Sequence, residues 1–159
     1  MDRFWHVGLT VSDMDRSLEF YRDVVGMEVA LGPFDGGGGG SGQLMQNPGL
    51  KLKVCWLRHG PLLFQILQYT AKQGSVLDLH HNNVGSPHLS FVIDDVEAKF
   101  AEVSARGDVV IASPLTEMGA GTARSFYCED PDGLPVEFWQ WNEAPEDPVM
   151  PIGGSRTTD

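Results

Sequence analysis

Apolar and polar residues alternate in two similar stretches of the chain. His6-Val-Gly-Leu-Thr-Val-Ser-Asp13 is matched further on by His88-Leu-Ser-Phe-Val-Ile-Asp-Asp95. Each stretch has the two-residue period of a half-buried strand, and each ends in an aspartate that can cap a following helix. The pattern therefore predicts two copies of one supersecondary unit, with a histidine at the start of the first strand in each.

The remaining elements are predicted in the same order in both copies. Apolar residues at helical spacing predict a helix from Asp13 to about Val25 and another from about Val96 to Arg106. Further strands are predicted over residues 27–31, 50–57 and 62–69, and over residues 109–112, 124–128 and 135–141. The repeated order of strand, helix and three strands predicts an α+β fold made of two βαβββ modules.

The chain is predicted to form one domain, residues 1–141, with modules over 1–70 and 86–141 joined by a polar linker, 71–85. Residues 142–159 read as an irregular tail rich in proline and acid. Residues 32–42, which contain the five glycines Gly36–Gly40, are predicted to form a flexible hairpin loop, with a lid over a site as the alternative. Residues 114–121 are predicted as a second loop.

Composition narrows the possible partners. The 159 residues are 42% hydrophobic and 21% charged, which is a globular balance, and the net charge is −11. Because the basic residues are few and scattered, nucleic acid and anionic membranes are poor partners. No signal peptide or membrane span is visible, and Cys55 and Cys128 are expected to be buried and reduced, so a cytoplasmic location is expected.

Four polar residues occupy equivalent places in the two modules. Strand alternation puts His6 and His88 on the faces opposite the apolar residues that should pack on the helices. Gln65 and Glu137 lie in the middle of apolar final strands, where a lone carboxylate is costly to bury unless it is paired or binds a metal. These four residues predict a shared site for one divalent metal ion: Zn, Co, Ni, Fe or Mn.

Other histidines compete for a metal-binding role. His59, His80 and His81 lie in turn and linker sequence, where solvated histidines are common, and they are weaker candidates. Aromatic residues near the predicted ligands are expected to line an apolar substrate pocket, with ordinary core packing as the alternative: Trp56, Tyr69, Trp139 and Trp141.

Three motifs resemble the vicinal oxygen chelate superfamily, which includes glyoxalases, bleomycin-resistance proteins and extradiol dioxygenases. They are the segments His6–Met27, His88–Ala98 and Asp130-Pro-Asp-Gly-Leu-Pro-Val-Glu137. The resemblance covers about residues 4 to 141. It implies a glyoxalase-like fold, in which paired βαβββ modules form a cupped, mostly antiparallel mixed sheet around one divalent metal. It also implies a substrate that chelates the metal through neighbouring oxygens.

The resemblance maps the family's four ligand positions onto His6, Gln65, His88 and Glu137. Many bacterial glyoxalase I enzymes carry glutamate at the position of Gln65, and the set found here is closer to methylmalonyl-CoA epimerase. That epimerase uses a further glutamate base on an early strand of its first module. The matching region here, near residues 43–46, offers glutamines, so a strict epimerase assignment is not favoured.

The favoured hypothesis is a metal-dependent isomerase or lyase of glyoxalase or epimerase type. The metal would polarise a carbonyl of a small substrate and stabilise an enediolate or enolate, while Glu137 moves the proton. One alternative is an Fe(II) extradiol-type dioxygenase that uses His6, His88 and Glu137. The other is a metal-free protein that binds small molecules and confers drug resistance. Exposed sheet edges favour a homodimer.

Overall fold

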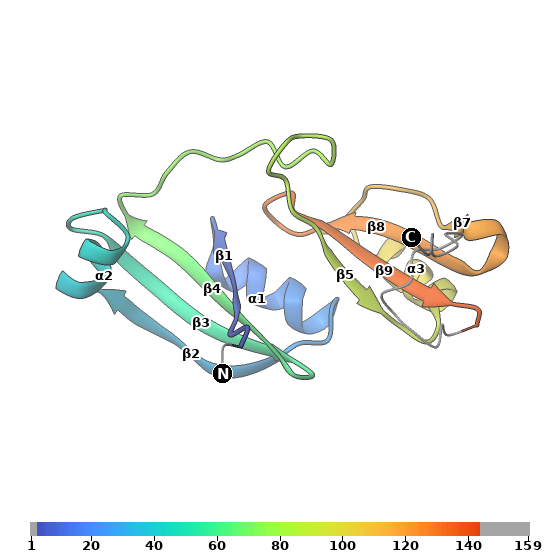
Figure 1. The fold of residues 1–159 in the computed structure, drawn as a ribbon, viewed down its shortest axis with the longest axis horizontal. Coiled ribbons are helices and arrows are strands. Elements are labelled where there is room, and N and C mark those ends of the chain that lie inside the picture. The colour runs from blue at the N-terminus through green and yellow to red at the C-terminus, as the bar shows by residue number, and fades with distance from the viewer. Residues whose placement is uncertain (1–2, 144–159) are drawn as a thin grey trace, which may run out of the picture. The chain divides into compact units, whose positions relative to one another are not determined.

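The structure is a computed structural model that describes residues 3–143, and the chain divides into two compact units, residues 1–77 and 78–159 (Figure 1). Each unit contains its own mixed β-sheet, with parallel and antiparallel strand pairs. The α+β fold class is therefore confirmed. The helices are short, and within the described range none is long and apolar enough to cross a membrane.

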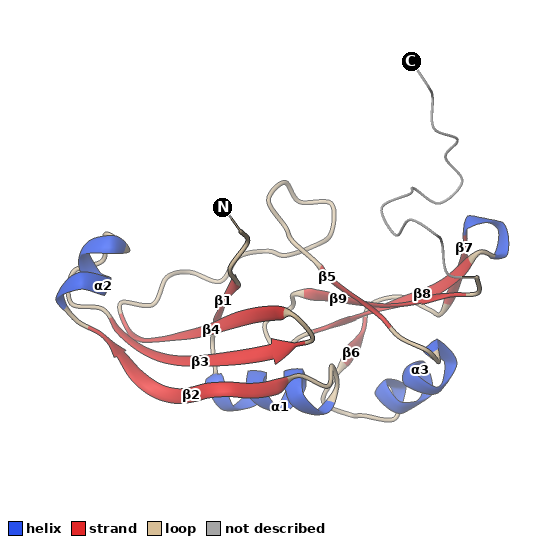
Figure 2. Cartoon of the chain, turned by 60° about the horizontal axis from the view of Figure 1, so that its bottom comes forward, coloured by secondary structure: helices blue, strands red, loops and turns tan. Residues whose placement is uncertain are grey.

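The first unit follows the predicted order and adds one short helix. Its elements are β1 (Val7–Val11), α1 (Met14–Asp23), β2 (Glu28–Gly37), α2 (Gly39–Leu44), β3 (Lys51–His59) and β4 (Leu62–Ala71). The strand order is β1-β4-β3-β2; β1 runs parallel to β4 and the other pairs are antiparallel. Helix α1 covers one face of this sheet (Figure 2).

The second unit repeats this arrangement with a shorter edge. Its elements are β5 (Leu89–Val92), α3 (Val96–Ser104), β6 (Val110–Ile111), β7 (Thr116–Met118), a 3-10 turn (Gly119–Gly121), β8 (Ala123–Glu129) and β9 (Pro135–Trp141). The path of the sheet is β5-β9-β8-β6, with β7 also paired to β8. Here β5 is parallel to β9, as β1 is to β4.

Each unit buries its own apolar core between helix and sheet. In the first unit the helix-side residues Tyr21 and Val24 and the strand residues Leu57 and Ile66 are all 0% exposed. In the second unit the fully buried set includes Val96, Val103, Phe126, Val136 and Phe138. The buried residues of the strands occupy alternate positions, so the strand residues between them face away from the helices. That second face is the one that carries the candidate site.

The two cysteines are buried and free, as predicted. Burial raises the pKa of the Cys55 thiol, and burial together with the nearby Asp130 raises the pKa of Cys128 to about 12. Both thiols are therefore held in the protonated form at neutral pH, and a protonated thiol is a poor nucleophile.

The predicted helix caps are present in both units. The side chain of Asp13 accepts a 3.0 Å hydrogen bond from the backbone N–H of Arg16, and Asp95 accepts a 2.9 Å bond from Ala98. Each aspartate satisfies an N–H group that the first helical turn leaves without a partner. The aspartates that mark the sequence repeat thus lie between the first strand and the helix and cap the helix in each unit.

The glycine-rich stretch is more ordered than predicted. Strand β2 continues to Gly37 and α2 begins at Gly39, so the expectation of a flexible loop over residues 32–42 was wrong. A Cβ at Gly36 would lie 2.9 Å from Val54 Cγ2, and one at Gly37 would lie 2.9 Å from the Leu50 carbonyl oxygen. The glycines therefore allow β2 to approach β3 closely, which is a packing reason for them.

The predicted loop over residues 114–121 also contains regular structure. Residues 116–118 pair with Ser125, Arg124 and Ala123 to form β7, and a 3-10 turn follows. Pairing with β8 supplies backbone partners that local sequence cannot reveal, so the prediction of a plain loop was wrong. The predicted irregular tail, 142–159, lies outside the described residues after Glu143.

Candidate functional site

The first unit places His6 and Gln65 on the same face of its sheet. Gly8 in β1 is the parallel partner of Gln65 in β4, and His6 lies two residues before Gly8. Because side chains alternate along a strand, His6 shares the face of Gly8 and Gln65. A Cβ atom added to Gly8 would meet no other atom within 4 Å, so there is open space beside Gly8 on this face.

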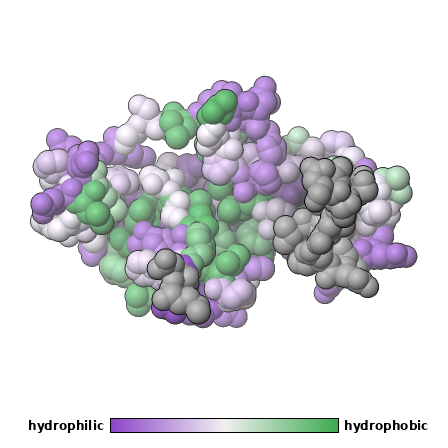
Figure 3. All heavy atoms as spheres, viewed as in Figure 1, coloured by the Kyte–Doolittle hydropathy of each residue, from purple (hydrophilic) through white to green (hydrophobic). Residues whose placement is uncertain are grey.

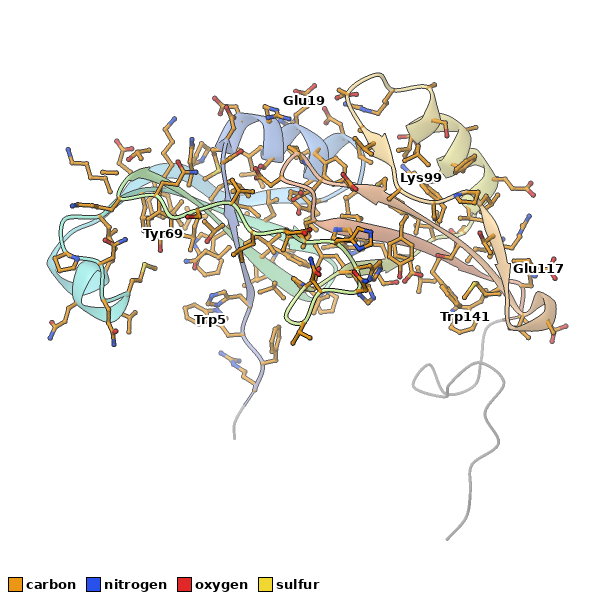
Figure 4. The ribbon with its side chains drawn as sticks, turned by 90° about the horizontal axis from the view of Figure 1, so that it is seen from above. Trp5, Glu19, Tyr69, Lys99, Glu117 and Trp141 are labelled. Carbon is orange, nitrogen blue, oxygen red and sulfur yellow. The ribbon has the colours of Figure 1, made fainter. Side chains whose placement is uncertain are left out.

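Aromatic rings enclose His6. Trp56 in β3 lies directly opposite Gln65, and its ring centroid is 4.9 Å from that of His6, edge to face. Trp5 stacks on Trp56 at 5.6 Å and meets the His6 ring edge to face at 4.6 Å. Figure 4 shows Trp5 on the side of the sheet away from α1. The Nδ1 atom of His6 is buried and has no hydrogen-bond partner among the residues that the structure describes.

The second unit places His88 and Glu137 in the equivalent arrangement. Ser90 in β5 is the parallel partner of Glu137 in β9, and His88 lies two residues before Ser90. Tyr127 in β8 lies opposite Glu137, as Trp56 lies opposite Gln65. Its ring centroid is 5.9 Å from that of His88. Each unit therefore combines one histidine, one residue with a side-chain carbonyl or carboxylate, and one aromatic ring.

Glu137 is a buried carboxylate with hydroxyl neighbours. It is 8% exposed, and its Oε1 accepts a 2.9 Å hydrogen bond from the hydroxyl of Ser125, which is 4% exposed. The pKa of Tyr127 is raised to about 12, mainly by burial and further by the negative charge of Glu137 and a hydrogen bond to that carboxylate. Tyr127 therefore keeps its proton at neutral pH and donates it toward the carboxylate.

The four predicted pocket aromatics share these faces. Trp56 lies opposite Gln65, and Tyr69 follows Gln65 at an even spacing; its hydroxyl is 3.3 Å from Met45 Sδ, just beyond α2. Trp139 and Trp141 follow Glu137 at even spacing, with ring centroids 5.0 Å apart. Figure 4 shows Tyr69 near α2 and Trp141 on the side of its sheet away from α3.

The face of the first unit is markedly apolar. Leu52, Val54 and Leu67 form a buried cluster with Leu50, and Met45, Trp56 and Tyr69 pack against it. Figure 3 shows hydrophobic residues over the strands of this unit on the face turned to the viewer. An apolar surface beside His6 and Gln65 can hold the non-polar part of a small molecule.

The competing histidines have different environments. His81 packs against two residues of the second unit's site, with ring centroids 5.0 Å from His88 and 4.7 Å from Tyr127. The Nδ1 atom of His80 is 2.7 Å from Asn82 Oδ1, within its own turn. His59 ends β3 beside the hairpin turn. The proximity of His81 to His88 was not foreseen, because the linker has no periodicity that places it.

The described part of the chain contains no group of three or more His, Cys, Asp or Glu side chains close enough to hold a metal ion. Each unit instead contributes two of the four predicted ligands. Sequence reasoning missed Trp5, Ser125 and Tyr127. The alternation of polar Ser125 and Tyr127 with buried Phe126 and Cys128 was the available signal, since it places both polar residues on the face of Glu137.

Comparison with known proteins identifies relatives of the chain. A lactoylglutathione lyase from Haemophilus influenzae is 30% identical over 135 residues, covering 84% of this chain and 88% of that protein. A probable lactoylglutathione lyase from Vibrio cholerae is 27% identical over 150 residues, covering 89% of this chain and 93% of that protein.

A crystal structure of a glyoxalase family protein from Bacillus cereus has the same fold. It aligns with a TM-score of 0.78 at 13% identity, over 89% of this chain and 95% of that one. The relatives support the prediction that the chain is an enzyme of the lyase class that depends on a divalent metal ion. Residues 3–138 match the family profile, and the chain belongs to the Glyoxalase/Bleomycin resistance protein/Dioxygenase superfamily.

Proposed function

We propose that this enzyme is a lyase or isomerase of glyoxalase type in which His6, Gln65, His88 and Glu137 bind one divalent metal ion. The observation that carries the proposal is the repeated arrangement of ligand-type side chains. In each unit a histidine precedes the first strand, and its partner lies on the same face of the last strand. The same pairing of a histidine with an oxygen-bearing side chain therefore occurs at equivalent positions of both units.

The residues present fit a divalent ion. Two imidazoles, an amide oxygen and a carboxylate oxygen suit Zn, Co, Ni, Fe or Mn. The unpartnered, buried Nδ1 of His6 shows that this ring has a nitrogen with unused bonding capacity. The buried carboxylate of Glu137 accepts a hydrogen bond from a hydroxyl group, and no ion pair joins it to a cationic side chain among residues 3–143. A bound cation would neutralise its charge.

The proposed chemistry divides between the ion and the protein. A divalent ion supplies Lewis acidity toward a carbonyl oxygen. Glu137 accepts a proton from the carbon next to that carbonyl and returns it to the neighbouring carbon. Gln65 is a neutral side chain, so it adds no second negative charge to the site. The apolar cluster around Val54 and Leu67 offers a surface for the non-polar part of the substrate.

The proposed substrate is a small molecule with neighbouring oxygens. The sequence relatives are named lactoylglutathione lyases, so the reaction that joins methylglyoxal and glutathione into lactoylglutathione is the first to test. The amide at Gln65 distinguishes this chain from the many bacterial glyoxalase I enzymes that carry a second carboxylate there. With this amide, an epimerase-like reaction is the second reaction to test under the same proposal. The active form is proposed to be a homodimer.

The decisive experiment is elemental analysis of purified protein, followed by assays of the metal-loaded enzyme with methylglyoxal and glutathione. Formation of lactoylglutathione that stops on chelation and returns with metal is expected. Glu137→Gln should reduce turnover by at least 100-fold, consistent with the loss of a general base. Glu102→Gln is the matched control, because Glu102 is an exposed residue of α3 that forms a surface ion pair with Lys99.

Three outcomes would contradict the proposal. Turnover that Glu137→Gln leaves intact in metal-loaded protein would remove Glu137 from proton transfer. Consumption of oxygen with a catechol and ferrous iron would assign the chain to the dioxygenases. Tight ligand binding by metal-free protein without turnover would instead indicate a small-molecule binding protein.

A further inference from the structure

Ser125 and Glu137 form a buried hydrogen-bonded pair across strands β8 and β9. The Ser125 hydroxyl is 2.9 Å from Glu137 Oε1, and the two residues are 4% and 8% exposed. An ionised carboxylate can only accept hydrogen bonds, so the serine must be the donor. The direction of the bond is therefore fixed, and Oε1 is the oxygen that it occupies.

The repeat shows that this serine is specific to the unit with the carboxylate. Ser125 lies two residues before Tyr127, which is opposite Glu137; in the first unit Val54 lies two residues before Trp56, which is opposite Gln65. Val54 belongs to an apolar cluster, whereas the hydroxyl of Ser125 donates a hydrogen bond to the ligand-type side chain. The unit with an amide has a valine at this position, and the unit with an acid has a serine.

We propose that Ser125 is a positioning residue for Glu137. Its hydrogen bond to Oε1 holds the carboxylate in one orientation, in which the carboxylate is presented to the metal ion. The inference rests on the proposed function, because it assumes that Glu137 is a metal ligand. Outer partners of this kind orient metal ligands, and their loss commonly weakens metal binding by 10- to 100-fold.

The test compares four full-length proteins stripped of metal: the natural chain, Ser125→Ala, Ser125→Thr and Ser17→Ala. Ser125→Thr keeps the hydroxyl and suits a strand. Ser17→Ala is the matched control, since Ser17 is also a buried serine, but its hydroxyl donates a 2.8 Å bond to the Asp13 carbonyl in the helix cap. Each protein is titrated with Co²⁺ while its visible absorption spectrum is recorded, and each is also unfolded thermally without metal.

Ser125→Ala is expected to raise the Kd for Co²⁺ by about tenfold or more and to change the spectrum. Ser125→Thr should restore both to within about threefold of the natural chain, and Ser17→Ala should alter neither. Wild-type affinity and spectrum in Ser125→Ala would overturn the inference, as would equal losses of affinity in Ser17→Ala and Ser125→Ala. A natural chain that does not bind Co²⁺ would overturn the proposed function itself, and the inference with it.

Discussion

The side chain of Gln140 accepts a 2.9 Å hydrogen bond from the backbone N–H of Val96, at the start of helix α3. Gln68 does the same for Met14 at the start of α1, at 3.2 Å, and also donates to the Ser12 carbonyl. In both units, therefore, the strand that carries the second predicted ligand is tied to the first turn of the helix. The repeat is preserved in a tertiary contact as well as in the strand order.

Removing this contact should lower stability. Gln140→Ala leaves the Val96 N–H without its partner and is expected to reduce the free energy of unfolding by about 1 kcal/mol. Urea denaturation followed by circular dichroism would measure the change. The same substitution at the exposed Gln73 should have no effect. A Gln140→Ala protein as stable as the natural chain would show that water replaces the side chain at no cost.

The glycines of the 32–42 segment should differ in their tolerance of a side chain. Gly37→Ala places a Cβ 2.9 Å from the Leu50 carbonyl oxygen at a backbone φ of +107, and about 1–3 kcal/mol of stability should be lost. Gly40→Ala meets nothing within 4 Å and lies inside α2, so it should be neutral or stabilising by up to about 1 kcal/mol. Thermal unfolding of both variants tests the contrast. Equal effects would argue that close packing does not explain Gly37.

Stability should depend on Tyr127 at alkaline pH. Its pKa is about 12 in the folded protein, above the ordinary value of 10, so the folded state holds the proton more tightly. The resulting stabilisation is fully present below about pH 10 and is lost as pH rises through about 12. Tyr127→Phe should show a shallower loss of stability in this interval. Unfolding curves and tyrosinate absorbance across the same pH range measure it; identical slopes in both proteins would refute the prediction.

Both thiols should be unreactive in the native protein. Burial raises the pKa of Cys55, and the pKa of Cys128 rises to about 12, so thiolate is scarce near neutral pH. Mass spectrometry after brief iodoacetamide treatment at pH 8 should find neither residue modified, and both modified once the chain is unfolded in urea. Rapid labelling of native Cys128 would show that the second unit opens readily.

Local sequence determined much of the secondary structure and the candidate ligand set. Strand alternation and the capping aspartates place His6 and His88 at equivalent positions, and the observed caps at Asp13 and Asp95 agree with that prediction. Strand β9 has the bounds that its pattern predicts. These features depend on backbone geometry within a few residues, which is why a single sequence suffices to find them. Whether the four candidate ligands share one ion remains a prediction.

Tertiary pairing decided what local sequence could not. Strand β2 extends through Gly36 and Gly37 because these residues pair with Leu52 and Lys51 of β3, and the close approach there leaves no room for a Cβ. Strand β7 forms because β8 offers it backbone partners. The hydroxyl of Ser125 meets Glu137 through the register of β8 with β9. Register is set by contacts between residues far apart in the chain. The sequence therefore identifies Glu137 as the carboxylate, but only the fold determines which side chains surround it.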